Sequence, residues 1–515
     1  MKEKPTGLIG VDIGTTHCKA SLFVEQGGLL QLAASSSKPS GARHAPAGYA
    51  YYDPEQLFGT VAACIREVQA AAADALPLAV GIASMAESGL LMDRESGSHL
   101  SPVLPWFDQT AAPQAAELGY HGDPDQRKRG FLRSGIYPSF KCSLAKILWW
   151  LEEQKMDIGN LVWLPVAAYI AFRLSGEMAC EPSLAGRTYA FDINRRVWDE
   201  EWLQKWGLAT KNFPPILESG ELVGGCLGDN QAGLPPGTPV CLAGHDHVCA
   251  AFAVGAVRPG MAFDSMGTAE SLMGAYQAGE MGEAEYRSGL SYGCHVAQGR
   301  NYWMGGLSAS GGSLEWLRGL LGKPPLSYDD LDALVEQAGA DPSGILYFPY
   351  LSGSGSPHSD PQARGAFVGL RASHQRADLV KALLEGTAYE LEFIRQAAEG
   401  AAGGRIGHIL AAGGGTRNRR WLQIKADVSG CTLEALEMTE VVTLGAALLS
   451  GMGSGRFANE AEALAARPEL GGESIYPNMK KHALYQEIYQ GGFLPLQEPL
   501  RELSRECQRL SGFNG

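Results

Sequence analysis

Apolar and polar positions near the N-terminus fall into short runs that are separated by glycine-rich turns. Residues 8–12, 18–24 and 29–33 have the composition of strands. Residues 261–264 and 271–276 repeat this arrangement around a Gly-Thr turn, about 250 residues further along the chain. The pattern therefore predicts two related halves, each beginning with an antiparallel meander, and a pivot near residue 250.

Segments with helical spacing of apolar residues alternate with strands in both halves. Predicted helices cover residues 54–75, 143–155, 378–398 and 418–429, and predicted buried strands cover residues 78–85 and 406–411. This alternation is typical of an α/β protein. The last fifty residues are polar and partly helical, so we expect them to pack on the body as a surface tail.

Composition narrows the class of protein. The chain has 515 residues, 45% of them hydrophobic, which is enough for two large domains. Its net charge of −14, without a basic stripe, argues against a nucleic-acid binder. No stretch of about 18 uncharged apolar residues predicts a membrane span, and the N-terminus does not have a signal-peptide core. Ten cysteines without a Cys-x-x-Cys pair predict reduced, mostly buried thiols and a cytoplasmic location.

Two turns have the chemistry of phosphate-binding loops. Asp12 ends a predicted strand, Gly14 lets the backbone approach a ligand, and the hydroxyls of Thr15 and Thr16 can bind phosphate oxygens. Taken alone, this segment also fits a plain hairpin turn with a capping aspartate. A similar turn recurs in the second half, so we expect the two turns to grip a polyphosphate together, with Asp12 holding Mg²⁺.

The second of these turns consists of Gly267 and Thr268, and a third glycine-rich loop covers residues 413–418. That loop lies between a buried strand and a helix, where backbone amides favour anions and glycine lets a planar ring approach. Asn418 stands where a dinucleotide fingerprint requires glycine, and the chain contains no P-loop. Tight packing of the loop, without a ligand, is the alternative interpretation.

A carboxylate and two histidines follow the apolar run at residues 240–243. Asp246 lies where open α/β sheets bind ligands, so it is a candidate general base that removes a proton from a hydroxyl nucleophile. It would also serve as a second metal ligand, and a structural aspartate is the alternative. His245 and His247 have the spacing of a zinc pair on one strand face, but no third ligand has convincing spacing.

Polar and aromatic residues of the first half predict a small polyol pocket. Aromatic rings cover the C–H face of a sugar, while carboxylates accept hydrogen bonds from its hydroxyls. The candidate substrate contacts are Ala86, Glu87, Trp106, Asp108 and His247. For Glu87, helix capping or pairing with a nearby arginine is the structural alternative.

These motifs together resemble those of the FGGY family of carbohydrate kinases, over about 450 residues. The C-terminal signature of the family is matched at residues 365–370 and 378–385. The segments at residues 12–16 and 267–268 look like its two phosphate motifs, and residues 413–418 look like its adenosine motif. Residues 146–149 resemble the N-terminal signature, although Lys141 departs from the small or aromatic residue expected there.

The resemblance implies an α/β fold of two ribonuclease-H-like domains, of the actin and hexokinase type, with ATP in the cleft between them. The N-terminal domain would cover residues 1–252, the C-terminal domain residues 253–465, and a helical tail residues 466–515. Asp246 would be the catalytic base. Gly311, Gly414 and Asn418 match nucleotide-contacting positions.

The resemblance also implies a function. We expect ATP- and Mg²⁺-dependent phosphorylation of a primary hydroxyl on a small sugar, with a pentulose such as D-xylulose favoured. Xylulokinases carry a Met-His pair where this chain has Ala86 and Glu87, so its pocket differs from theirs. Glycerol, erythritol and gluconate remain alternative acceptors. A non-kinase actin-like ATPase and a zinc hydrolase built on the histidines are alternative functions, and a homodimer is compatible with the sequence.

Overall fold

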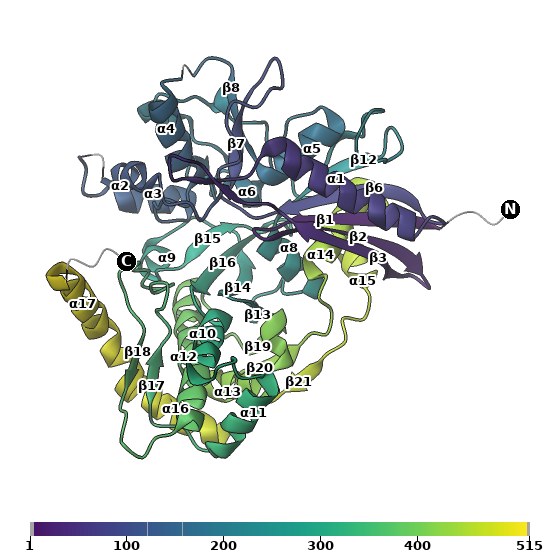
Figure 1. Cartoon of the computed structure of the whole chain (residues 1–515). Helices are drawn as coiled ribbons and strands as arrows, with labels where there is room; N and C mark the ends of the chain where they lie inside the picture. Colours follow the sequence, from purple (N-terminus) through teal and green to yellow (C-terminus); the bar gives the residue numbers. More distant parts are fainter. Residues whose placement is uncertain (1–4, 121, 157, 512–515) are drawn as a thin grey trace.

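Two β-sheets organise the molecule, one in each half of the chain (Figure 1). The computed structural model describes residues 5–120, 122–156 and 158–511. The first sheet contains, in spatial order, Leu222–Gly225 (β11), Pro239–His245 (β12), Leu76–Ser84 (β6), Thr6–Ile13 (β1), His17–Gln26 (β2) and Leu29–Pro39 (β3). The second contains Ser291–Cys294 (β15), Arg300–Leu307 (β16), Glu270–Gln277 (β14), Met261–Met266 (β13), His408–Ala412 (β19), Thr432–Ala435 (β20) and Glu473–Ile475 (β21).

The two sheets share one pattern of strand pairing, which confirms the repeat predicted from the sequence. In the first half, β1 pairs antiparallel with β2 and parallel with β6, and β6 continues in parallel to β12. In the second half, β13 pairs antiparallel with β14 and parallel with β19, and β19 continues in parallel to β20. The hairpins β1–β2 and β13–β14 therefore carry the two phosphate-type turns at equivalent places in their sheets.

Helices cover the first sheet on both sides. Pro54–Ala71 (α1) packs on β2 and β3, and Val166–Ser175 (α5) packs on β6 and β12. Val441–Gly453 (α14) packs on β1, β6 and β12, beside Asp246–Val254 (α8). In the sequence, α14 falls within the segment expected for the second domain, yet it covers the sheet of the first.

The contact of α14 with the first sheet is close enough to require glycine. A Cβ atom on Gly10 in β1 would lie 1.8 Å from the carbonyl oxygen of Thr443, so no larger residue fits there. Most neighbours of this contact are apolar and fully buried, including Val248, Leu444 and Leu448. This core joins α8 and α14 to the first sheet and extends to apolar residues of the second.

The second half is built around the long helix Arg376–Ala402 (α12). Arg419–Ser429 (α13), Gly311–Leu321 (α10) and Tyr328–Gln337 (α11) pack against α12. In the expected tail, β21 completes the second sheet and Met479–Ile488 (α16) packs on α13. The final helix, Leu494–Ser511 (α17), runs along the side of this half towards the boundary between the halves (Figure 1).

The remaining elements complete the two halves. The first half also contains Gly89–Asp93 (β7), Leu161–Pro165 (β8), Ala112–Tyr120 (α2), Gln126–Ser134 (α3), Ser143–Gln154 (α4), Pro182–Ala185 (α6), Glu200–Lys205 (α7), Arg43–His44 (β4), Ala50–Tyr51 (β5), Phe191–Asp192 (β9) and Val197–Trp198 (β10). The second adds Glu283–Arg287 (α9), Leu346–Phe348 (β17), Ala366–Val368 (β18) and Glu460–Ala465 (α15). Short helical turns cover Thr210–Asn212 (η1), Gly414–Arg417 (η2) and Tyr489–Phe493 (η3).

Two further observations bear on the sequence predictions. Nine of the ten cysteines are buried with free thiols, and Cys507 is exposed. In the described part of the chain, no helix combines the length and apolar character needed to cross a bilayer.

Candidate active site

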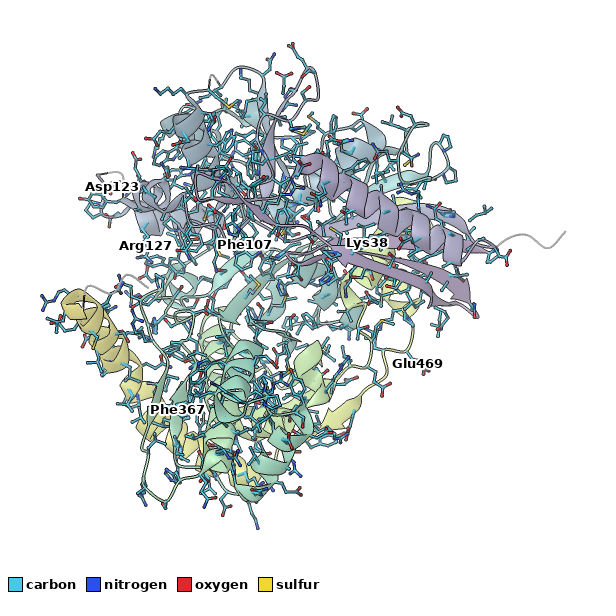
Figure 2. All side chains as sticks on the ribbon, in the orientation of Figure 1. Lys38, Phe107, Asp123, Arg127, Phe367 and Glu469 are labelled. Atoms are coloured by element: carbon cyan, nitrogen blue, oxygen red, sulfur yellow. The ribbon has the colours of Figure 1, made fainter. Side chains whose placement is uncertain are left out.

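A cavity of about 780 Å³ lies between the two halves. Its lining includes many of the predicted site residues: Thr15, Thr16, Ala86, Glu87, Trp106, Asp246, His247 and Gly267. Phe107 also lines it, and Figure 2 shows this residue at the boundary between the halves. Strand ends and turns from both sheets therefore meet at one place, as expected for residues that act together on one substrate.

Asp246 is positioned by the first turn of α8. One of its carboxylate oxygens accepts a hydrogen bond of 2.7 Å from the backbone N–H of His247, and the same oxygen lies 3.2 Å from Nε2 of His245. Burial disfavours the ionised form, but the charge of His247 and the hydrogen bond from His245 outweigh it, so the pKa of Asp246 is lowered. The carboxylate lines the cavity, and the lowered pKa favours the ionised form that a general base requires.

Asp12 lies near the end of β1, close to Asp246. Its Oδ1 atom is buried and has no hydrogen-bond partner among the described residues. Burial and the negative charge of Asp246 raise the pKa of Asp12, while Lys19 opposes them. A buried, unpartnered carboxylate oxygen beside a second carboxylate favours a cation.

The first phosphate-type turn is held from two sides. The indole N–H of Trp106 donates a hydrogen bond of 2.9 Å to the Thr15 hydroxyl oxygen, and the Tyr52 hydroxyl donates one of 2.8 Å to the Thr15 carbonyl. Gly14 closes the turn by donating its N–H to the His17 carbonyl. Trp106 thus contributes to the cavity wall and fixes the turn that we expect to contact phosphate.

The second turn is braced by a buried charge network. Lys425 of α13 lies 2.9 Å from the carboxylate of Asp264 and 2.5 Å from that of Glu270, and all three side chains are fully buried. Glu270 also accepts a hydrogen bond from the Ser310 hydroxyl. Burial and the neighbouring Glu270 raise the pKa of Asp264, whereas Lys425 opposes this change. The network fixes β13 and β14 on both sides of Gly267 and Thr268.

Gly311 begins α10 directly against that turn. Its N–H donates to the Gly267 carbonyl, and a Cβ atom at Gly311 would lie 2.6 Å from that oxygen. Gly311 and Thr268 do not line the 780 Å³ cavity. In this structure the glycine therefore serves close packing of the turn, and contact with a nucleotide remains a prediction.

Glu87 forms an ion pair with Arg187. Both Nε, at 2.8 Å, and Nη2 of the arginine donate to the same carboxylate oxygen. Burial opposes ionisation of Glu87, but Arg187 outweighs it and lowers the pKa of this carboxyl. The backbone of Glu87 has φ of 57°, a left-handed conformation that costs free energy in a residue with a side chain. The arginine pairing that we considered as the structural alternative is thus present, and both side chains line the cavity.

The side chain of Asp108 is held by backbone groups. Its carboxylate accepts hydrogen bonds from the backbone N–H groups of Ala50, at 2.6 Å, and Thr110, at 3.0 Å. It does not line the cavity, whereas its neighbour Gln109 does. Two backbone donors therefore fix this carboxylate in its loop, and its contact with a substrate stays a prediction.

Sequence reasoning did not select two cationic residues of the cavity, Arg187 and Lys141. Arg187 is 100 residues from its partner Glu87, so no spacing pattern connects them. Lys141 was visible only as a departure from the N-terminal signature. Its position in the cavity wall shows that the departure lies at the site itself.

The glycine loop at residues 413–418 borders a different cavity, of about 510 Å³, which shares no lining residue with the first. Gly414 lines it, and a Cβ atom at this position would have no neighbour within 4 Å. Asn418 caps α13 through the N–H of Trp421 and donates to Asp332, but does not line the cavity. The structure thus leaves open space at Gly414 and gives Asn418 a capping contact.

The histidine pair shows no arrangement for zinc. The ring centroids of His245 and His247 are 5.5 Å apart. Within residues 5–120, 122–156 and 158–511, no group of three or more His, Cys, Asp or Glu side chains is placed to hold a metal ion. We therefore assign no metal to the two histidines.

Comparison with known proteins identifies the class. The sequence profile of the FGGY family of carbohydrate kinases matches with its N-terminal domain at residues 8–253 and with its C-terminal domain at residues 265–454. The chain belongs to the FGGY family of carbohydrate kinases. This confirms the family and the two-domain α/β fold expected from the motifs.

The similar proteins include kinases of two different acceptors, xylulose and glycerol. A xylulose kinase of Bacillus subtilis is 28% identical over 499 residues, which cover 94% of this chain and 96% of that protein. A glycerol kinase of Gloeobacter violaceus is 28% identical over 482 residues, which cover 90% and 91%. The crystal structure of xylulose kinase from Rhodospirillum rubrum matches with a TM-score of 0.86 and 26% identity, over 97% of this chain and 100% of that one.

Proposed function

We propose that this protein transfers the γ-phosphoryl group of ATP to a primary hydroxyl of a small sugar, with Asp246 as general base. A pentulose such as D-xylulose is the first candidate acceptor, and the xylulose kinases among the similar proteins and solved structures support it. Glycerol is the alternative, because a glycerol kinase is equally similar in sequence, at 28% identity. The observation that carries the proposal is the carboxylate of Asp246 at the start of α8, in a cavity lined by residues of both phosphate-type turns.

The chemistry follows from the positions of these groups. The acceptor hydroxyl approaches Asp246, which takes its proton as the oxygen attacks the γ-phosphorus in line. Charge develops on the transferring oxygens, and the amides and hydroxyls of the two turns are fixed donors for it. Trp106 and the Lys425 network hold those turns in place before the substrate arrives. Most of the catalysis is therefore positioning.

Asp12 fits a Mg²⁺ ion that accompanies the nucleotide. Protein sites for Mg²⁺ use one or two carboxylates together with phosphate oxygens and water. The buried, unpartnered Oδ1 of Asp12 provides such an oxygen, and Asp246 is close enough to raise its pKa. A bound Mg²⁺ supplies positive charge against the phosphate oxygens. Asp12 would hold that ion on the phosphate side of the cavity.

A panel of acceptors tests the proposed function. ATP consumption by the purified protein should rise when D-xylulose is added, and glycerol, erythritol and gluconate test the alternative acceptors. Product should form in a 1:1 ratio with ADP. If ATP is hydrolysed at the same rate with every acceptor and with none, the protein acts as an actin-like ATPase and the kinase proposal is wrong.

Replacing Asp12 by asparagine should raise the Mg²⁺ concentration that gives half-maximal activity. We expect an increase of about 10- to 100-fold, the size typical of changes around a bound metal. The measurement is initial rate against Mg²⁺ at saturating ATP and acceptor. Asp74→Asn, at an exposed position between α1 and β6, is the matched control and should leave the curve unchanged. An unchanged Mg²⁺ dependence in Asp12→Asn would make Asp12 a structural residue.

Gly414→Val should raise the KM for ATP more than the KM for the acceptor. The open space at this position leaves room for the side chain in the free protein, so the added atoms meet only a bound ligand. Crowding typically costs about 1–3 kcal/mol, which corresponds to an increase of about 5- to 150-fold. Steady-state kinetics with each substrate varied in turn measures both constants. Equal changes in both would show that the purine does not lie against this loop.

A further inference from the structure

A second cavity, of about 870 Å³, adjoins the active-site cavity on the sugar side. Glu87, Gln109, Phe140, Lys141 and Arg187 line both cavities. Asp246 and the phosphate-type turns line only the first, and the far end of the second is formed by α17. Lys141 therefore lies at the junction, away from the phosphoryl-transfer end.

The second cavity is cationic, although the chain as a whole is acidic, with a net charge of −14. Three carboxylates line it, Glu87, Asp360 and Glu498, together with six cations: Arg127, Lys141, Arg187, Arg287, Arg501 and Arg505. Four of these cations are in ion pairs, with Glu87, Glu283, Glu498 or Asp360 as partners. Within the described residues, Lys141 and Arg127 have no ion-pair partner.

Lys141 is held in place without having its charge neutralised. Its ammonium nitrogen lies over the Trp106 ring, 5.3 Å from the centroid. The buried Lys146 of α4 donates hydrogen bonds to the carbonyls of Phe140, at 2.8 Å, and Lys141, at 2.6 Å, so the backbone that carries Lys141 is fixed. The side chain is exposed to the cavity, where the enclosing protein lowers the pKa of its ammonium group and Glu87 opposes this change.

The other cation at the junction is already neutralised. Arg187 donates twice to Glu87, and the pair therefore contributes no net charge. The junction is thus left with the single positive charge of Lys141. One carboxylate matches that charge, whereas a phosphate group carries about two negative charges near neutral pH and would need a second free cation at the junction itself, where Arg127 does not lie.

We infer that Lys141 is a specificity-determining residue that binds the carboxylate of an acyclic sugar acid, while the primary hydroxyl at the other end of the same molecule reaches Asp246. An aldonate has this chemistry, with a carboxylate at one end of the carbon chain and a primary hydroxyl at the other. The inference rests on the proposed kinase function and changes its preferred acceptor from a neutral pentulose to an aldonate. A neutral ketose would leave the ammonium group of Lys141 without a counter-charge.

Matched acceptor pairs test this inference. D-Gluconate and D-glucitol have the same number of carbons and differ at the end where the carboxylate stands, and D-xylonate and xylitol form a second pair. Glycerol 3-phosphate, compared with glycerol, presents a phosphate in place of the carboxylate. We expect kcat/KM to be higher for the aldonate in each of the first two pairs. A preference for the neutral partner, or for glycerol 3-phosphate over the aldonates, would overturn the inference.

Variants locate the contact. Lys141→Met should lower the aldonate-to-alditol ratio of kcat/KM by about 10- to 100-fold, the size expected for a hydrogen bond between charged groups. Lys141→Arg should restore most of the ratio. Arg127→Met is the matched control, because among the described residues Arg127 also has no ion-pair partner, lies over the Tyr137 ring, and lines the second cavity but not the first. Figure 2 labels Arg127.

The Arg127 variant separates a specific contact of Lys141 with the carboxylate from a general effect of the positive potential in the cavity. Arg127→Met should leave the ratio unchanged. An equal fall in both variants would mean that the positive potential of the cavity, not Lys141 itself, attracts the acid, and would overturn the inference. If the wild-type protein phosphorylates xylulose or glycerol but the ratio does not respond to Lys141→Met, the inference fails while the proposed function stands. If no acceptor is phosphorylated, the proposed function fails.

Discussion

Asp246→Asn should lower kcat by about 10²–10⁴, because the variant keeps the shape of the side chain and loses the base. The amide can still accept a hydrogen bond from the backbone N–H of His247, so the first turn of α8 should keep its structure. Initial rates at saturating ATP and acceptor measure the loss. Calorimetry should show that the variant binds ATP with nearly the affinity of the wild-type protein.

The same experiment needs a control for the exchange of carboxylate for amide. Asp229→Asn changes an exposed turn residue in the same way, and turnover should stay at the wild-type level. A melting temperature that is unchanged in Asp246→Asn would show that the fold is intact. Turnover in Asp246→Asn equal to that of the control would remove Asp246 from the mechanism.

Lys425→Met should lower the free energy of unfolding by about 3–5 kcal/mol, because it leaves the buried carboxylates of Asp264 and Glu270 without a counter-charge. Urea denaturation measures the loss. The loss should be smaller at pH 5 than at pH 8. Burial already raises the pKa of Asp264 to about 7 while Lys425 opposes this change, so removing Lys425 raises it further. The folded variant therefore holds the Asp264 proton more tightly than the unfolded chain does, and its stability falls as the pH rises.

A second lysine variant shows whether the loss of stability in Lys425→Met arises from the burial of the network. Lys480→Met lies at an exposed position in the first turn of α16 and should change the unfolding free energy by less than about 0.5 kcal/mol. If Lys425→Met were no more destabilising than this control, or equally destabilising at both pH values, the network would not support the second turn in the way that we describe.

The fold was predictable because its signals are local. Alternating apolar residues and a glycine turn are sufficient to specify the β1–β2 hairpin, and their recurrence at β13–β14 revealed the two halves. Asp246 and Asp12 were likewise found from their positions at strand ends, since ligands in such sheets gather there.

The pocket was harder to predict because it depends on which way side chains point. Asp108 had the right residue type beside Trp106, but the N–H groups of Ala50 and Thr110 bind its carboxylate. The pairing of Arg187 with Glu87 joins segments 100 residues apart, so no periodic spacing in the sequence predicts it. Residue types can therefore nominate a pocket, whereas only the folded chain shows which charges remain unpaired.

The position of α14 has a consequence for folding while the chain is being synthesised on the ribosome. One face of the first sheet, around Gly10, is completed by a helix that ends at Gly453, roughly two hundred residues after α8. At the usual synthesis rate of about 5–20 residues per second, this interval lasts about 10–40 s. During that time the nascent first half exposes the apolar strip that α14 will cover, so a fragment that stops at the pivot should need a chaperone or should aggregate.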